Sequence, residues 1–183
     1  SAVTAPASFL IEPAAGPIRA GAEFALTLTA RNVAGAATPN FDTQALNDAL
    51  AIGHAVTLEV GCHAQGGNKR SIAAAAPVFR AGVAKVAASW PDVGNIDLHA
   101  RLSNFLDTGL VASGNTNTAG AGGCSGAVGP FIPAYFEVAL ATPRSIYYAG
   151  EPFPLRVSAM NKAGAVTLNY SALRKPVSYT HLT

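Results

Sequence analysis

Two stretches of similar sequence decide the fold: ARNVAGAATPNFD at residues 30–42 and AMNKAGAVTLNYS at residues 159–171, 129 positions later. In both, an Asn precedes Ala-Gly, and a Thr, a second Asn and an aromatic residue follow at matching places. Asn and Gly tolerate positive φ, so each stretch predicts a turn that leads into a further strand. A period this long is typical of tandem sandwich domains and not of a solenoid.

The residues before each turn alternate between apolar and polar once Gly21 is aligned with Gly150. This pattern predicts a strand with one buried face in each copy. The apolar positions are Phe24, Leu26, Leu28 and Ala30 in the first copy and Phe153, Leu155, Val157 and Ala159 in the second. Another match lies upstream, at Pro6–Phe9 and Pro133–Phe136. We interpret the pair as a hairpin that recurs because a second domain of the same type begins.

The first copy has room for the rest of a domain. Further alternating segments occur at His54–Val60, Ala84–Trp90 and Asn95–Leu102, and Asp42–Leu50 is the one helical candidate. About seven short strands with turns between them predict an all-β, immunoglobulin-like β-sandwich. Its expected core is Phe24, Leu26, Leu28, Val86, Trp90, Ile96 and Leu98.

The predicted organisation has three parts. Residues 1–128 form the immunoglobulin-like domain with a Gly-rich C-terminal linker, and residues 129–175 form a truncated second copy. Because the second copy is too short for a core of its own, we expect it either to lean on the first domain or to be poorly ordered. Residues 176–183 resemble a translated adapter tail, with an edge strand as the alternative. The chain begins at Ser1 without a signal peptide, so we expect a fragment of a longer protein.

Composition excludes several classes of protein. Half of the residues are hydrophobic, 12% are charged, and the net charge is +2. This low charge gives no reason to expect disorder. The sequence also lacks the concentrated basic cluster that binding to nucleic acid requires. No apolar run approaches the roughly 18 residues of a membrane span. We expect no cofactor.

The two cysteines, Cys62 and Cys124, are predicted to form a disulfide. An even count in a strand-rich chain that we take to be exported favours this pairing. The alternative is a metal site built from Cys62, His63 and Cys124, but this spacing matches no zinc pattern. We therefore expect no metal.

Other candidates for chemistry are weak. Ser125 in GGCSGA only approaches a nucleophile elbow, and the four histidines occupy unrelated positions. Asp92, Asn95 and Asp97 could hold Ca²⁺, although a turn rich in Asp and Asn explains them as well. The sequence thus predicts no catalytic residues and no enzyme.

A string of motifs resembles the C-terminal region of the MshQ-like family, proteins of MSHA type IV pilus biogenesis. The motifs are the Trp90–Ala100 strand pair, the Gly-rich linker, GPFIPAYFEV from Gly129, and Tyr147–Tyr170. The family's G-R-F-x-P-D-H-F pattern is met at Gly129, Phe131, Pro133 and Phe136, but its Arg and Asp-His pair are absent. The resemblance implies an extracytoplasmic protein of a Gram-negative envelope, in the periplasm, outer membrane or cell surface.

Three functions follow as hypotheses. The first is a non-enzymatic structural or adhesive module whose partners are other envelope or pilus-assembly proteins, or surface glycans. The second is a carbohydrate-binding β-sandwich, which needs exposed aromatic residues on one face, whereas Trp90 alternates inward. The third, a hydrolase, lacks a nucleophile placed beside a base.

Overall fold

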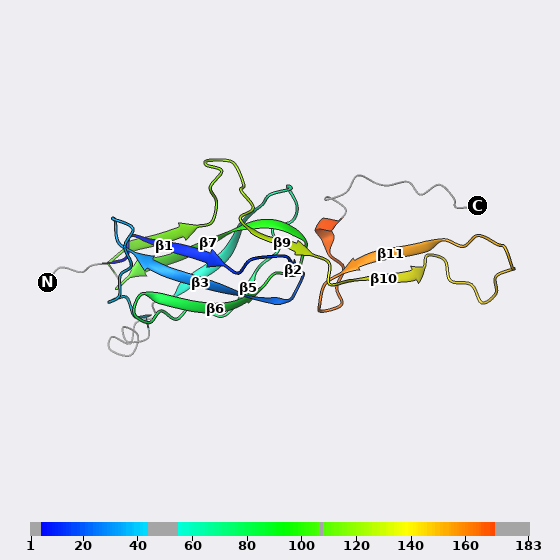
Figure 1. Ribbon diagram of the computed structural model, residues 1–183, viewed down its shortest axis with the longest axis horizontal. Coiled ribbons are helices and arrows are strands. Elements are labelled where there is room, and N and C mark those ends of the chain that lie inside the picture. Colours follow the sequence, from blue (N-terminus) through cyan, green and yellow to red (C-terminus); the bar gives the residue numbers. More distant parts are fainter. Residues whose placement is uncertain (1–4, 44–54, 107, 171–183) are drawn as a thin grey trace.

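The computed structural model describes residues 5–43, 55–106 and 108–170 (Figure 1). These residues form strands and connecting loops, with one short 3₁₀ helix, η1, at Leu168–Tyr170. The strands are β1 (Ser8–Pro13), β2 (Ile18–Arg19), β3 (Glu23–Arg31), β4 (Val56–His63), β5 (Ala73–Ala74), β6 (Val83–Ser89), β7 (Gly94–Phe105), β8 (Leu110–Asn115), β9 (Val128–Ile132), β10 (Tyr135–Leu140) and β11 (Leu155–Met160). No helix in the described part of the chain is long and apolar enough to cross a membrane.

Strands β1 to β9 form a sandwich-like body, which confirms the predicted all-β class. One layer runs in the order β1-β3-β6-β5. In the other, β7 pairs with β4 along one edge and with β8 and β9 along the opposite edge. A single parallel pair between β1 and β8 joins the layers. The immunoglobulin-like topology stays a prediction.

The core lies between these layers, where the alternation placed it. Phe24, Leu26, Leu28, Val86, Trp90, Ile96 and Leu98 are all buried in one cluster, as predicted. Burial of the Trp90 ring requires a partner for its indole N–H, and Nε1 donates a 2.8 Å hydrogen bond to the Arg70 carbonyl. The apolar faces of β3, β6 and β7 are therefore buried, and the indole nitrogen has a partner.

The repeat seen in the sequence is also a repeat of backbone structure. Strands β1 and β3 pair antiparallel with Phe9 opposite Ala30, and β10 and β11 pair antiparallel with Phe136 opposite Ala159. These are the residues that the two sequence alignments equate. The hairpin of β10 and β11 forms its own two-stranded sheet and projects from one end of the sandwich (Figure 1).

The two copies differ in what covers their apolar faces. Leu26 and Leu28 are 1% and 0% exposed, whereas their counterparts Leu155 and Val157 are 55% and 61% exposed. In the first copy, the layer containing β7 covers this face; no described residue provides such a layer for the second.

Parts of the predicted organisation are not decided by these observations. Strand β9 begins at the predicted boundary, residue 128, and pairs with β7 and β2 of the sandwich. The division into residues 1–128 and 129–175 stays a prediction. The tail at 176–183 and most of the helical candidate Asp42–Leu50 lie outside the described residues.

Candidate functional site

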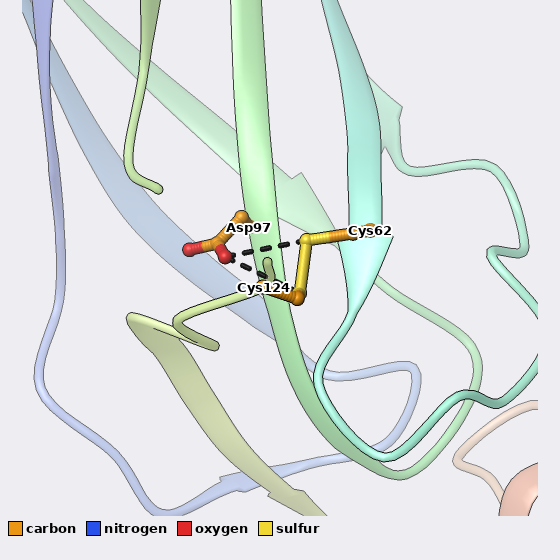
Figure 2. A group of neighbouring side chains, drawn as sticks. All are labelled: Cys62, Asp97 and Cys124. Carbon is orange, nitrogen blue, oxygen red and sulfur yellow. Dashed lines mark hydrogen bonds between the residues drawn. A yellow bond between two sulfur atoms is a disulfide. The ribbon is translucent and has the colours of Figure 1, made fainter. Parts of the chain in front are cut away.

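The disulfide links a strand of the sandwich to the Gly-rich segment that follows β8. Cys62 and Cys124 are joined with their Cα atoms 6.0 Å apart. Cys62 lies in β4 beside a register shift, and its partner across the ladder is Asp97 of β7. Figure 2 shows the Asp97 carboxylate directed at the bond between the two sulfur atoms.

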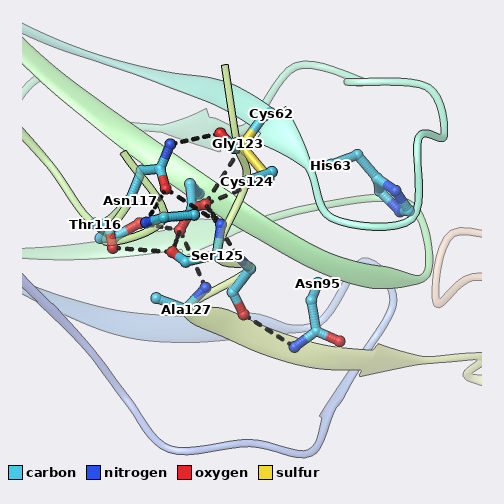
Figure 3. The surroundings of a disulfide bond; sticks show 12 residues. Cys62, His63, Asn95, Thr116, Asn117, Gly123, Cys124, Ser125 and Ala127 are labelled. Atoms are coloured by element: carbon cyan, nitrogen blue, oxygen red, sulfur yellow. Dashed lines mark hydrogen bonds between the residues drawn. A yellow bond between two sulfur atoms is a disulfide. The ribbon is translucent and has the colours of Figure 1, made fainter. Parts of the chain in front are cut away.

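Asp97 is the centre of a hydrogen-bond network that holds this segment in place. Figure 3 shows three residues that donate to it, Thr116, Ser125 and Ala127, near the disulfide. The buried carboxylate accepts hydrogen bonds from the amides of Ser125, Gly126 and Ala127 at 2.7, 2.9 and 3.0 Å. The hydroxyls of Ser125 and Thr116 donate to it at 2.8 and 3.0 Å. Five donors thus converge on one side chain, so the loop closes over the sheet through its main chain.

These donors decide the charge of Asp97. Burial alone would raise the pKa of its carboxyl, but the hydrogen bonds from Ala127, Gly126, Ser125 and Thr116 outweigh burial and hold that pKa below its ordinary value. Oδ2 also lies 3.3 Å from the sulfur of each cysteine. Disulfide sulfurs carry no hydrogen, so we treat these as close contacts without hydrogen bonding.

The alternative metal site does not assemble around His63. Its Nε2 lies 3.0 Å from the Val93 carbonyl, and its Nδ1 accepts hydrogen bonds from the amides of Gln65 and Gly67. Both ring nitrogens are therefore engaged, and Figure 3 shows the ring pointing away from the disulfide. Cys62, Asp97 and Cys124 have ligand atoms within 4.8 Å of one another, but the sulfur atoms are bonded together.

A second polar network joins the repeated hairpin to the sandwich. It involves the segment 161–169, which we name the Asn161 loop. Its Asn161 Nδ2 donates a 3.0 Å hydrogen bond to the Pro91 carbonyl, and the Lys162 amide donates a 2.8 Å bond to the Ala20 carbonyl. Asn161 is 2% exposed, so the contact excludes solvent.

Asp92 anchors the other end of the Asn161 loop. Its carboxylate is fully buried and accepts hydrogen bonds from the amides of Leu168 and Asn169 at 3.1 and 2.9 Å. The side chain of Asn169 then pairs with the main chain of Asn68, accepting from its amide at 2.7 Å and donating to its carbonyl at 3.0 Å. We call Ala20, Asn68, Pro91 and Asp92 the acceptor end of the sandwich.

The same internal hydrogen bonds close the turn in both copies. Asn32 Oδ1 accepts from the amides of Ala34 and Ala36, and Asn161 Oδ1 accepts from those of Ala163 and Ala165. Positive φ is taken by Gly35 and Gly164 and not by either Asn. The prediction of turn chemistry is thus confirmed for the glycines. The asparagines act through their side-chain oxygens instead.

The remaining candidates fall in different places. Gly129 and Phe131 lie in β9, where Phe131 is buried against Trp90; Pro133 is half-buried and Phe136 is 51% exposed. The Ca²⁺ candidates serve two loops: Asp92 binds the Asn161 loop, whereas Asp97 and Asn95 both bind the Gly-rich segment, with Asn95 Nδ2 donating to the Gly126 carbonyl.

The sequence missed the two buried carboxylates. Asp97 alternates to the outer face of β7, where an exposed residue is expected, but the Gly-rich segment covers it. The sequence around Asp92 is typical of a turn, but its carboxylate contacts Asn169, 77 positions away. Neither contact has a local signal in the sequence; the recurring Asn residues, 32 and 40 in the first copy and 161 and 169 in the second, mark only the loop that meets Asp92.

The geometry thus defines an all-β chain with a disulfide-braced sandwich and a hairpin docked on its end. Residues 92–182 match the family model described as DUF6701, third domain. No curated protein and no solved structure gives a significant match to the chain.

Proposed function

We propose that this chain is a non-enzymatic structural module of an extracytoplasmic protein, in which β-sandwich repeats are held end to end. The observation that carries the proposal is the contact between the Asn161 loop and the acceptor end. It pairs the repeated hairpin with the sandwich, so it sets the orientation of the hairpin relative to the sandwich. A spacer or presenting module needs such fixed junctions, because flexible links would lose reach and direction.

The disulfide supports an extracytoplasmic location. Disulfides persist in oxidising compartments and are rare in the cytosol of mesophiles. The bond between Cys62 and Cys124 also locks the Gly-rich segment, which joins β8 to β9 without a strand of its own. Such bracing suits a protein that works outside the cell.

The polar groups around Asp97 support a structural role over a catalytic one. Ser125 donates its hydroxyl to Asp97, whose carboxylate already accepts several amides, and the ring of His63 points elsewhere. A nucleophile needs a base with free capacity to take its proton. Ser125 and Asp97 instead serve to close a loop.

We further propose that the parent protein belongs to a Gram-negative envelope system of the MSHA pilus type, with a structural or adhesive role. The resemblance of the motifs at Gly129, Phe131, Pro133 and Phe136 to MshQ-like proteins supports this. The description of the matched family as a third domain is compatible with a serial array. Its partners would be other envelope or pilus-assembly proteins.

Residual dipolar couplings of the full chain test the proposal. If the module is a rigid spacer, couplings from β1, β3 and β7 and those from β10 and β11 fit one alignment tensor. Independent tensors for the two groups would overturn it. A glycan array probed with the same protein tests the carbohydrate-binding alternative. We expect no specific glycan signal from Trp90, whose ring is fully buried, and a specific signal would favour the alternative, with the exposed Tyr148 as the residue to test.

A further inference from the structure

The first copy contains a loop equivalent to the docked one, and it lies at the opposite end of the sandwich. This is the segment 32–40, which we name the Asn32 loop. Ala20, just before β3, is at the acceptor end, and β3 then runs nine residues to Arg31. At about 3.3 Å per residue, this places the Asn32 loop about 30 Å away.

The two loops have the same internal construction. In each, the Asn amide donates to the carbonyl four residues on, and a Thr donates its amide and hydroxyl to the carbonyl eight residues back. The aromatic residue after each loop also packs on its own hairpin, as Phe41 on Phe9 and Tyr170 on Phe136. The Asn32 loop is therefore already in the shape that the Asn161 loop has when docked.

The groups that dock in the second copy are presented to solvent in the first. Asn32, Val33 and Asn40 are exposed, with Val33 96% exposed. Among the described residues, neither the Asn32 Nδ2 nor the amides of Val33 and Asn40 donate to another group. Their counterparts in the second copy are the Asn161 Nδ2 and the amides of Lys162 and Asn169, which all cross the junction.

We propose that the Asn32 loop is a docking surface for the acceptor end of another sandwich unit of this kind, joined ahead of β1 in the same polypeptide. Asn32 Nδ2 would donate to the carbonyl of the preceding unit that is equivalent to that of Pro91, and the Val33 amide to the one equivalent to that of Ala20. Asn40 would bind the carboxylate equivalent to that of Asp92. One bond differs, because Pro39 stands where Leu168 donates to Asp92 and proline has no N–H. The inference goes beyond the proposed function, since it holds whether the array is structural or adhesive.

An in-frame duplication tests the proposal. Residues 1–133 are joined directly to residues 7–183, so that a complete first copy follows the leading copy at the position of β10. The probe is this tandem protein, studied by amide hydrogen exchange. We expect the Val33 and Asn40 amides of the inner copy to exchange at least tenfold more slowly than the same amides of the leading copy.

The matched control is Asn32→Asp in the inner copy. Asp keeps the oxygen that closes the loop and loses only the Nδ2 donor, so the protection should disappear while the loop persists. Equal, fast exchange in both copies, with the Leu26 and Leu98 amides protected in each, would overturn the proposal.

A transplant keeps the proposal testable if the tandem protein does not fold. The sequence NVAGAATPN of the Asn32 loop replaces residues 161–169 in the single chain. Slow exchange of the amide at position 169, within tenfold of the parent chain, supports the proposal. The control is the same transplant with Asn161→Asp. If the amide at position 169 exchanges equally fast in the transplant and in this control, the proposal is overturned.

Discussion

The main-chain amide of Asn169 donates a 2.9 Å hydrogen bond to the buried carboxylate of Asp92, across 77 positions of sequence. The side chain of Asn169 also pairs with the main chain of Asn68 on the neighbouring loop. A single residue of the second copy therefore holds two loops of the first. Because buried polar groups are costly when unpaired, this arrangement favours one orientation of the hairpin over all others.

The first prediction compares Asn161→Asp with Asn32→Asp. Both substitutions keep the oxygen that closes the turn, but only the first removes a buried donor, Nδ2 to the Pro91 carbonyl. We expect Asn161→Asp to weaken docking by about 2 kcal/mol, hence roughly 30-fold faster exchange of the Lys162 amide. Asn32→Asp should leave that rate unchanged. Identical effects of the two variants would contradict the assigned role of Asn161.

The second prediction uses two leucines at equivalent places in the repeat. Leu26→Ala truncates a fully packed side chain and should lower the free energy of unfolding by about 2–5 kcal/mol. Leu155→Ala removes a side chain that is 55% exposed and should cost less than about 1 kcal/mol. Chemical denaturation monitored by Trp90 fluorescence measures both. Equal losses would mean that the second copy is as well covered as the first.

A third prediction concerns the disulfide. The double variant Cys62→Ser, Cys124→Ser should lose about 4 kcal/mol of stability, because the bond closes a long loop with a separation of 62 residues. Reduction of the unfolded parent protein should add two hydrogens by mass spectrometry. Two titratable thiols in the unreduced, unfolded protein would show that the pairing is wrong.

The fourth prediction concerns acid stability through Asp97. Its folded-state pKa is lowered, because the hydrogen bonds outweigh burial, so the unfolded chain binds the proton more tightly. The stability that Asp97 contributes is therefore fully present above about pH 5 and is lost as the pH falls through the folded-state value. Thermal unfolding across pH 2–7 should show this trend.

Asp97→Asn provides the comparison. At pH 7 the variant should be less stable by on the order of 3 kcal/mol, since several buried donors lose their charged acceptor. The difference from the parent protein should shrink as the pH falls. Glu137→Gln, at an exposed position on β10, is the control and should change stability little. A constant difference between parent and Asp97→Asn over the whole pH range would contradict the account.

Local pattern was enough to predict several of the strands, their core residues and the repeat. Alternation identified β3, β6 and β7 and placed Leu28 and Leu98 inside, because a strand with one dry face leaves a period of two in the sequence. The pairing of Cys62 with Cys124 followed from their number and from the class of protein.

The junction and the network at Asp97 could not be predicted in this way. Asp92 and Asp97 are polar residues that become buried only when distant loops fold over them. Aspartates are expected on the surface because they are charged, and the alternation along β7 predicts that Asp97 lies on its outer face. Main-chain amides from distant loops bind these carboxylates. Because almost every residue type has such an amide, the sequence does not show which residues will donate.

The most direct test of the central claim, that the second copy is docked through its Asn161 loop, is amide hydrogen exchange of the full chain. The amides of Lys162 and Val33 occupy equivalent places, but only the first donates across the junction, to the Ala20 carbonyl. The account predicts that Lys162 exchanges at least 100-fold more slowly than Val33. Equal rates for the two amides would contradict it.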